Sequence, residues 1–306
     1  MVKRLISSTS SELLSLNAKE LIEAIEASEG RVMVAETVGT VPSMFYPYSN
    51  AEAVAAFGAD MIILNVFDVD NPMVYGYDHV EKKEVVREIK RLTGRPIGIN
   101  LEPVDEEEKT LGEITKLSTG RLATADNGKK AADMGVNFIV LTGNPGTGVS
   151  NKAIAASLKS IRREVGDSLI LIAGKMHAAG SHKEAAQNII TKEDVKSFVE
   201  AGADVILFPA PGTVPGITME YIRELVEYAH SLGVLTLTAI GTSQEGADEA
   251  TIREIALMCK MTGTDMHHIG DAGYPGMAVP ENITAYSIAI RGKRHTYNRM
   301  VASVNR

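Results

Sequence analysis

The sequence predicts an α/β fold in which eight β-strands and their helices close into a (β/α)8 barrel. Eight glycines, each 28 to 41 residues after the last, stand just ahead of short apolar runs: Gly30, Gly58, Gly94, Gly135, Gly166, Gly202, Gly233 and Gly263. One strand, one helix and two short loops fill such an interval. Before every second run the motif reads glycine, any residue, then Asp or Asn, as in Gly58-Ala59-Asp60. Glycine in the left-handed conformation ends a helix there, and the next strand begins at once.

The apolar runs themselves are the predicted strands, because near-continuous hydrophobic stretches are typical of strands buried on both faces. Their ranges are 32–37, 61–68, 96–103, 137–143, 169–177, 205–211, 235–241 and 265–270. The helical pattern over 219–233 puts Ile222, Leu225, Val226 and Ala229 on one stripe. A doubly wound open sheet is the alternative, but it requires an early glycine-rich phosphate loop, and no GxGxxG follows the first run.

We expect the 306 residues to form one domain, because a barrel of this kind takes about 250 residues. Residues 1–29 are predicted as a helical plug under the barrel, with a helix over 10–28 whose second half Asn17 caps. Residues 30–290 form the barrel and residues 291–306 a basic helical tail. The basic cluster at 291–295 is expected to be a solvated face or a subunit contact rather than a nucleic-acid site.

Composition narrows the class of protein. Charged residues make up 23% and hydrophobic residues 44%, as in ordinary soluble proteins, and no apolar run approaches a membrane span. The net charge of -8 argues against nucleic-acid binding. The single cysteine, Cys259, excludes an intrachain disulfide and is expected to be buried on a helix. Two long aromatic loops, 38–50 and 69–83, suit a lid or a subunit interface. We expect a cytoplasmic homo-oligomer without membrane or nucleic-acid partners.

Polar side chains gather at the carboxyl ends of the predicted strands, where barrels of this fold carry their active sites. The residues expected to hydrogen-bond a substrate there are Asn65, Asn100, Thr142 and Asn144. Glu36 and Glu102 are expected to orient a lysine or substrate hydroxyls. These side chains define the predicted site.

The end of the fifth strand is the most specific feature. A period of two places Lys175 and His177 on the same face as Leu169, Leu171 and Ala173. If that face points into the barrel, desolvation lowers the pKa of the lysine amine and makes it a base or an imine-forming nucleophile, with His177 as proton shuttle. The alternative is a structural ion pair with Glu102 or Glu36.

Two glycine-rich loops after the seventh and eighth strands suit phosphate binding through backbone N–H groups. The residues concerned are Gly241, Thr242, Ser243, His268, Gly270 and Gly273. Asp271 argues against phosphate, because a carboxylate repels the anion unless a cation intervenes. The alternative is a pair of tight turns that need glycine.

A metal site is a further alternative, because Glu36, Glu102, His177 and His268 come from four strand ends and offer oxygen and nitrogen ligands for a divalent ion. His267 and His268 must face opposite sides of a strand, so one of them is expected to pack against the helices. No cofactor is otherwise required by the sequence.

Three stretches resemble known barrel families. Gly-Ala-Asp-Met-Ile-Ile-Leu-Asn at 58–65 and Arg-Pro-Ile-Gly-Ile-Asn at 95–100 resemble strand units of the BtpA family and of ribulose-phosphate-binding barrels. Residues 206–210 are similar to the sixth strand of keto-deoxy-phosphogluconate aldolases, whose Schiff-base lysine has no counterpart here. Residues 268–276 are similar to the phosphate loop of Rubisco-like barrels, from which Asp271 departs. The resemblance implies a phosphate-binding barrel.

These observations lead to three functional hypotheses. The first is an enzyme that acts on a small phosphorylated sugar or keto acid by proton abstraction or carbon–carbon cleavage, using Lys175; this is a lyase or an isomerase. The second is a metal-dependent hydrolase that uses Glu36, Glu102, His177 and His268. The third, implied by the BtpA resemblance, is a non-catalytic barrel for ligand binding or assembly.

Overall fold

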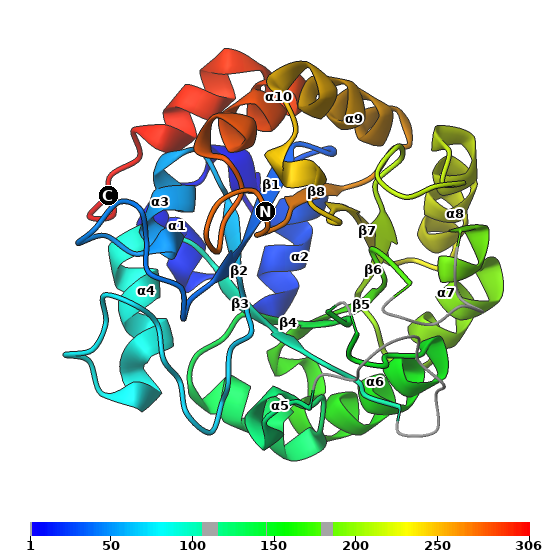
Figure 1. The fold of residues 1–306 in the computed structure, drawn as a ribbon, viewed down its shortest axis with the longest axis horizontal. Helices are drawn as coiled ribbons and strands as arrows, with labels where there is room; N and C mark the ends of the chain where they lie inside the picture. Colours follow the sequence, from blue (N-terminus) through cyan, green and yellow to red (C-terminus); the bar gives the residue numbers. More distant parts are fainter. Residues whose placement is uncertain (1, 106–115, 145, 179–185) are drawn as a thin grey trace.

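The computed structural model describes residues 2–105, 116–144, 146–178 and 186–306, and its eight parallel strands close into a barrel in sequence order (Figure 1). The predicted fold class is confirmed. The strands are β1 (Val32–Val38), β2 (Met61–Asn65), β3 (Ile97–Leu101), β4 (Phe138–Leu141), β5 (Ile170–Gly174), β6 (Val205–Pro209), β7 (Leu235–Ile240) and β8 (Met266–Ile269). All but the first end before the predicted last residue.

A ring of helices surrounds the strands (Figure 1). It comprises α3 (Asn50–Ala56), α4 (Val85–Thr93), α5 (Ala125–Asp133), α6 (Asn151–Val165), α7 (Lys192–Glu200), α8 (Met219–Ser231), α9 (Glu249–Met261) and α10 (Pro280–Met300). The stripe predicted on α8 is buried, and Cys259 lies buried on α9. Within the described ranges, no helix is both long and apolar enough to cross a membrane.

The chain ahead of β1 forms two helices rather than the single one predicted, α1 (Ser10–Ser15) and α2 (Ala18–Glu26). The break comes at Asn17, whose side chain accepts a hydrogen bond from the backbone N–H of Glu20 at 2.9 Å and so caps α2, as expected. Leu13, Leu21 and Ile25 are buried in one apolar cluster with the inward-facing residues of the strands. The N-terminal helices therefore close one end of the barrel, and α2 lies across the ring in Figure 1.

On several strands, the inward-facing positions change from apolar to polar toward the carboxyl end. Inward positions near the strand starts, such as Val34, Ile63 and Phe138, belong to the apolar cluster that α2 covers. The next inward positions toward the carboxyl ends carry Glu36 and Asn65. A substrate can therefore reach polar groups only from the carboxyl ends of the strands.

All eight glycines of the repeat have positive φ, as the motif predicts. The structure adds a second role for the Asp or Asn two residues after every second glycine, because its side chain accepts a backbone N–H from the preceding strand. We call these contacts the strand-pair braces. Their four hydrogen bonds are Met33 N–H to Asp60 at 2.8 Å, Ile97 to Asn137 at 3.1 Å, Leu171 to Asp204 at 2.8 Å and Thr236 to Asp265 at 2.8 Å.

The first brace is also the centre of a buried ionic cluster. Asp60 pairs with Arg291 and, at 2.7 Å, with Arg299, and all three side chains are at most 2% exposed. Burial raises the pKa of the Asp60 carboxyl, but the guanidinium groups outweigh it and leave the pKa below its ordinary value. Arg95, buried beside them, has its pKa lowered to about 9, mainly by desolvation. The expectation of a solvated basic face is therefore wrong for Arg291, which anchors α10 to the barrel.

Candidate active site

A small cavity of about 120 Å³ opens at the carboxyl ends of the strands. Its lining comes from almost every strand end: Glu36, Asn65, Asn100, Thr142, Gly143, Asn144, Met176, His177, Gly241, Thr242, Ser243, Glu245, Gly270, Asp271 and Ala272. Most of the predicted substrate-binding residues therefore lie together. Three carboxylates contribute, and none of the lining residues that the structure describes is Lys or Arg.

Three asparagine amides form the floor of the cavity around Asn65. The Asn65 Nδ2 donates to Asn144 Oδ1 and to Asp271 Oδ2, both at 2.9 Å. The Asn65 Oδ1 accepts from Asn100 Nδ2 at 3.2 Å and from Asn144 Nδ2 at 3.1 Å. These bonds fix each amide, because its donor and acceptor ends are assigned by the neighbours. The Asn100 Oδ1 and the Thr142 hydroxyl are buried without a hydrogen-bond partner among the described residues, so both can receive a ligand.

The two histidines of β8 face opposite sides, as predicted. His268 points inward, and its Nε2 lies 3.1 Å from Oε2 of Glu36; the two side chains are 0% and 6% exposed. His267 packs against α10, where its Nε2 lies 3.0 Å from the Gly30 carbonyl. Burial lowers the pKa of His267 to about 4, so the ring is neutral near pH 7. Of the two histidines, only His268 contributes to the site, and it does so by contacting the carboxylate of Glu36.

Asp271 is the most perturbed carboxyl group of the cavity. Burial, and then the negative charge of Glu36, raise its pKa to about 6, while the hydrogen bond from Asn65 acts in the opposite direction. Burial also raises the pKa of Glu245, and Asp271 adds to that rise. The three carboxylates are therefore electrostatic neighbours, and Asp271 titrates close to physiological pH, where a general acid or base works best.

Glu245, which the sequence analysis missed, joins the two glycine-rich loops. Its Oε1 accepts the backbone N–H of Ala272 at 3.0 Å. A Cβ on Gly270 would lie 2.7 Å from that oxygen, and one on Gly273 would lie 2.9 Å from the Glu245 carbonyl oxygen. Glycine is therefore needed here for the two loops to pack around Glu245. A glutamate next to Gly246 in the loop after the seventh strand is the only sequence signal for this contact.

Several groups predicted to hold phosphate are engaged within the protein. The Thr242 hydroxyl donates to the Thr213 carbonyl at 3.1 Å, and the Ala272 N–H donates to Glu245. Ser243 lines the cavity with a positive φ. The loops lie where the sequence analysis placed them, and they bring a carboxylate to the point where a phosphate was expected.

Lys175 and His177 follow β5 rather than belonging to it, because the strand ends at Gly174. Leu169, Leu171 and Ala173 pack on the helix side, so the face predicted to point inward points outward within the strand. The chain turns after Gly174: Lys175 is 1% exposed, whereas His177 lines the cavity. Burial, followed by the charge of Lys175, lowers the pKa of His177 to about 4. Lys175 and His177 therefore lie close to each other, as predicted, but because of the turn after Gly174 and not because they share a face of the strand.

Glu102 is 1% exposed and lies beside the cavity. Its Oε1 accepts from the Arg121 guanidinium at 2.5 Å, and its Oε2 accepts the backbone N–H of Asn144 at 3.0 Å. Arg121 was not predicted as a partner, because it lies in the connection after β3 without any periodic signal. Glu102 thus fixes the backbone that carries Asn144.

The four residues proposed as metal ligands are only partly brought together. Glu36 and His268 are in contact, whereas Glu102 is bound to Arg121. Across the described part of the chain, no three His, Cys, Asp or Glu side chains are arranged so that they could hold a metal ion. The geometry therefore gives the metal hypothesis no support.

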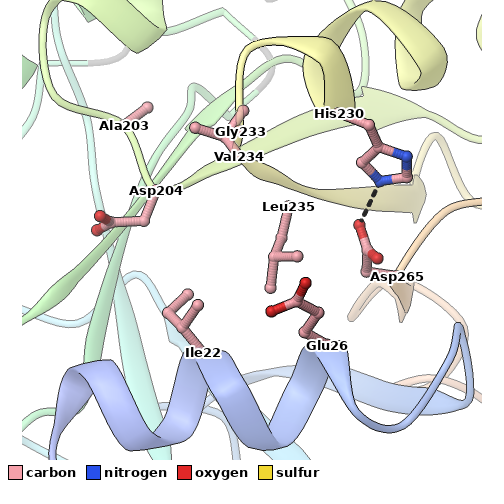
Figure 2. A pocket seen from close by; sticks show the side chains of 9 residues that line it. All are labelled: Ile22, Glu26, Ala203, Asp204, His230, Gly233, Val234, Leu235 and Asp265. Carbon is pink, nitrogen blue, oxygen red and sulfur yellow. Dashed lines mark hydrogen bonds and ion pairs between the residues drawn. The ribbon is translucent and has the colours of Figure 1, made fainter.

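A larger hollow of about 380 Å³ lies at the opposite end of the barrel, between α2 and the starts of β6, β7 and β8 (Figure 2). Both aspartates that line it belong to the strand-pair braces: Asp204 also pairs with Arg162 at 2.5 Å, and Asp265 binds His230 at 2.8 Å. Figure 2 shows His230 directed at Asp265, with Glu26 on α2 nearby. The aspartates there bind backbone N–H groups of neighbouring strands, in keeping with the stabilising role of the amino-terminal end of such barrels.

Comparison with solved structures finds the same fold. An archaeal fructose 1,6-bisphosphate aldolase aligns with a TM-score of 0.57 and 15% identity over 90% of this chain and 99% of that one. Thiamine phosphate pyrophosphorylase from Pyrococcus furiosus aligns with a TM-score of 0.47 and 15% identity, over 86% and 97%. At 15% identity, the alignment with the aldolase shows a likeness of fold alone. The resemblance to the BtpA family stays a prediction.

No curated protein matches the sequence. One family profile matches residues 6–306, which include the whole barrel together with α1 and α2. The chain therefore belongs to the family described as Domain of unknown function (DUF7916).

Proposed function

We propose that this protein is an enzyme that moves protons next to the carbonyl group of a small hydroxylated compound, as a lyase or an isomerase. The observation that carries the proposal is that Asp271 and Glu36 line one cavity together with hydrogen-bonded asparagine amides, and that His268 contacts Glu36 from behind. Two titratable groups with different surroundings can divide the roles of base and acid.

Asp271 suits the role of general base. Its raised pKa, about 6, leaves the carboxylate ionised at neutral pH yet basic enough to accept a proton from carbon. The Asn65 amide holds its Oδ2, which leaves the other oxygen for the substrate. The proton taken from carbon goes to Asp271 and returns to the neighbouring carbon in an isomerase, or to the leaving fragment in a lyase.

The Glu36–His268 pair suits the opposite role. The imidazole Nε2 lies 3.1 Å from Glu36 Oε2, so a proton can move along this contact and through Glu36 to the substrate oxygen, on which negative charge develops. His268 is fully buried and absent from the cavity lining, so it acts by positioning Glu36 and sharing its proton. Asn100 and Thr142 offer unpaired polar atoms to substrate hydroxyls.

Deuterium exchange tests this reaction class before the substrate is known. A panel of hydroxyketones and keto acids, each in free, phosphorylated and aminated form, is incubated with the protein in deuterated water and followed by NMR. Proton abstraction next to a carbonyl places deuterium on that carbon. Asp271→Asn is expected to slow the exchange by about 10²–10⁴-fold.

Asp126→Asn is the matched control, because Asp126 is an exposed residue of α5 that pairs with Lys130 and does not line the cavity. It should leave the exchange unchanged. Exchange that survives Asp271→Asn, or the absence of exchange with every compound, contradicts the proposal.

Imine chemistry at Lys175 is a second candidate, supported by the burial of that amine beside His177. A desolvated lysine is a better nucleophile, because burial disfavours the charged form. Reduction with borohydride in the presence of the same panel would add the mass of a carbonyl compound at Lys175. No adduct there, or an equal adduct on Lys175→Met protein, would leave the carboxylates as the working groups.

A further inference from the structure

The cavity presents hydrogen-bond acceptors that lack donors. Glu245 is 2% exposed, and its Oε2 has no hydrogen-bond partner among the described residues, while Oε1 is bound to the Ala272 N–H. Asn100 Oδ1, on a side chain that is 4% exposed, is likewise unpaired. Buried acceptors without partners destabilise a protein unless a ligand or water supplies the donors. A ligand that offers several hydrogen-bond donors would therefore suit these acceptors.

The charge of the cavity points to one kind of donor. Glu36, Glu245 and Asp271 line it, and the described lining includes no cationic side chain. Like charges raise the pKa of Asp271 and of Glu245, in addition to burial. A positive charge placed between these carboxylates would reduce the repulsion among them and stabilise the ionised forms of Asp271 and Glu245, whereas a phosphate would add to the repulsion.

The arrangement of the carboxylates distinguishes an organic cation from a metal ion. A metal needs ligands that converge on one point at about 2–2.5 Å, and the described side chains show no such group. An ammonium group instead reaches separate acceptors with three N–H donors.

We propose that the cavity binds a small aminated polyol, with its ammonium group on Glu245 and its hydroxyl groups on Asn100 and Thr142. This inference rests on the proposed function only in assuming that the substrate binds in the cavity at the carboxyl ends of the strands. It makes the substrate an amine-bearing hydroxy carbonyl compound, and it replaces the phosphorylated substrate expected from the sequence.

Serinol and glycerol are the probes, because they have the same carbon skeleton and differ in one amine. Binding is measured by titration calorimetry and by saturation-transfer NMR near pH 7, where serinol carries a positive charge. Serinol is expected to bind at least tenfold more tightly than glycerol, and glycerol phosphate more weakly still. Equal binding of serinol and glycerol, or tighter binding of glycerol phosphate or of inorganic phosphate, overturns the proposal.

The variant Glu245→Gln removes the charge and keeps an oxygen that can accept the Ala272 N–H. It is expected to weaken serinol binding at least tenfold, about 1.4 kcal/mol, and to weaken glycerol binding by a much smaller factor. Glu249→Gln is the matched control, because Glu249 is on the exposed surface of α9 and pairs with Arg253. Circular dichroism checks that each variant is folded.

The two proposals fail separately. Serinol binding that Glu245→Gln does not change contradicts the amine site, whatever deuterium exchange shows. Exchange that Asp271→Asn does not change contradicts the proton-transfer function, even if serinol binds as expected.

Discussion

The buried carboxylate of Asp60 is expected to be a main support of the barrel, and Asp60→Asn measures its contribution. The amide of Asn can still accept the Met33 N–H, so the strand-pair brace remains. The charge is lost, however, and Arg95, Arg291 and Arg299 are left buried without their counter-ion. Removal of one partner from a buried ion pair costs about 3–5 kcal/mol, and we expect the free energy of unfolding to fall by that amount.

The expected change in melting temperature follows from the length of the chain. Unfolding entropy is about 2.1 cal/mol/K per residue, which gives about 0.6 kcal/mol/K for 306 residues. The melting temperature should therefore fall by about 5–8 °C in scanning calorimetry. Because the pKa of Asp60 is lowered in the folded state, its contribution is present above the unfolded pKa and is lost as the pH falls through the folded value. The difference between wild type and Asp60→Asn should therefore shrink in strong acid.

Asp204→Asn is the matched control, because Asp204 forms the equivalent brace near the surface. Its side chain is 36% exposed, and burial raises rather than lowers the pKa of its carboxyl. Loss of that charge should cost about 1 kcal/mol or less. If Asp60→Asn is no more destabilising than Asp204→Asn, the ionic cluster around Asp60 does not stabilise the fold as argued.

Three further predictions concern the site and its surroundings. Asp271→Asn should increase the free energy of unfolding near pH 8 by up to about 2–3 kcal/mol, and so raise the melting temperature there, but not near pH 4. The reason is that the pKa of Asp271 is raised to about 6 in the folded protein, so ionisation of this carboxyl group destabilises the fold. An equal change at both pH values contradicts this. Gly270→Ala should cost about 1–3 kcal/mol in thermal unfolding, because the new Cβ would lie 2.7 Å from the Glu245 Oε1; an unchanged melting temperature would contradict this contact. Cys259, whose pKa burial raises to about 11, should react with a thiol reagent only after unfolding, so rapid labelling of native protein would count against the packing.

The fold could be predicted from the sequence because its signals are local. A glycine with positive φ and the apolar run that follows it lie within a few residues of each other, and this pattern occurs eight times. The amide floor could also be predicted, because Asn65 and Asn100 take the last inward position of their strands. Alternation along a regular strand is sufficient to place such residues.

The rest of the site depends on contacts between distant loops. The direction of Lys175 depends on where β5 ends, and the chain turns at Gly174, whose φ is +154° and where a Cβ would lie 1.9 Å from the Leu207 carbonyl oxygen. Glu245 enters the site only because the loops after β7 and β8 pack together. No periodicity of the sequence reports such a contact, so both residues required the structure.

The strand-pair braces divide the barrel into quarters that are local in sequence, since each joins an even strand to the odd strand just before it. New chain ends at Gly166, where the surroundings are open, would fall between two quarters and leave every brace within a short stretch of chain. New ends at Gly202 would place Leu171 and Asp204 at opposite termini of the rearranged chain. Their contact would then become one of the most distant in sequence, and folding should slow accordingly. Circular permutation should therefore be tolerated best at the boundaries between the four braced strand pairs.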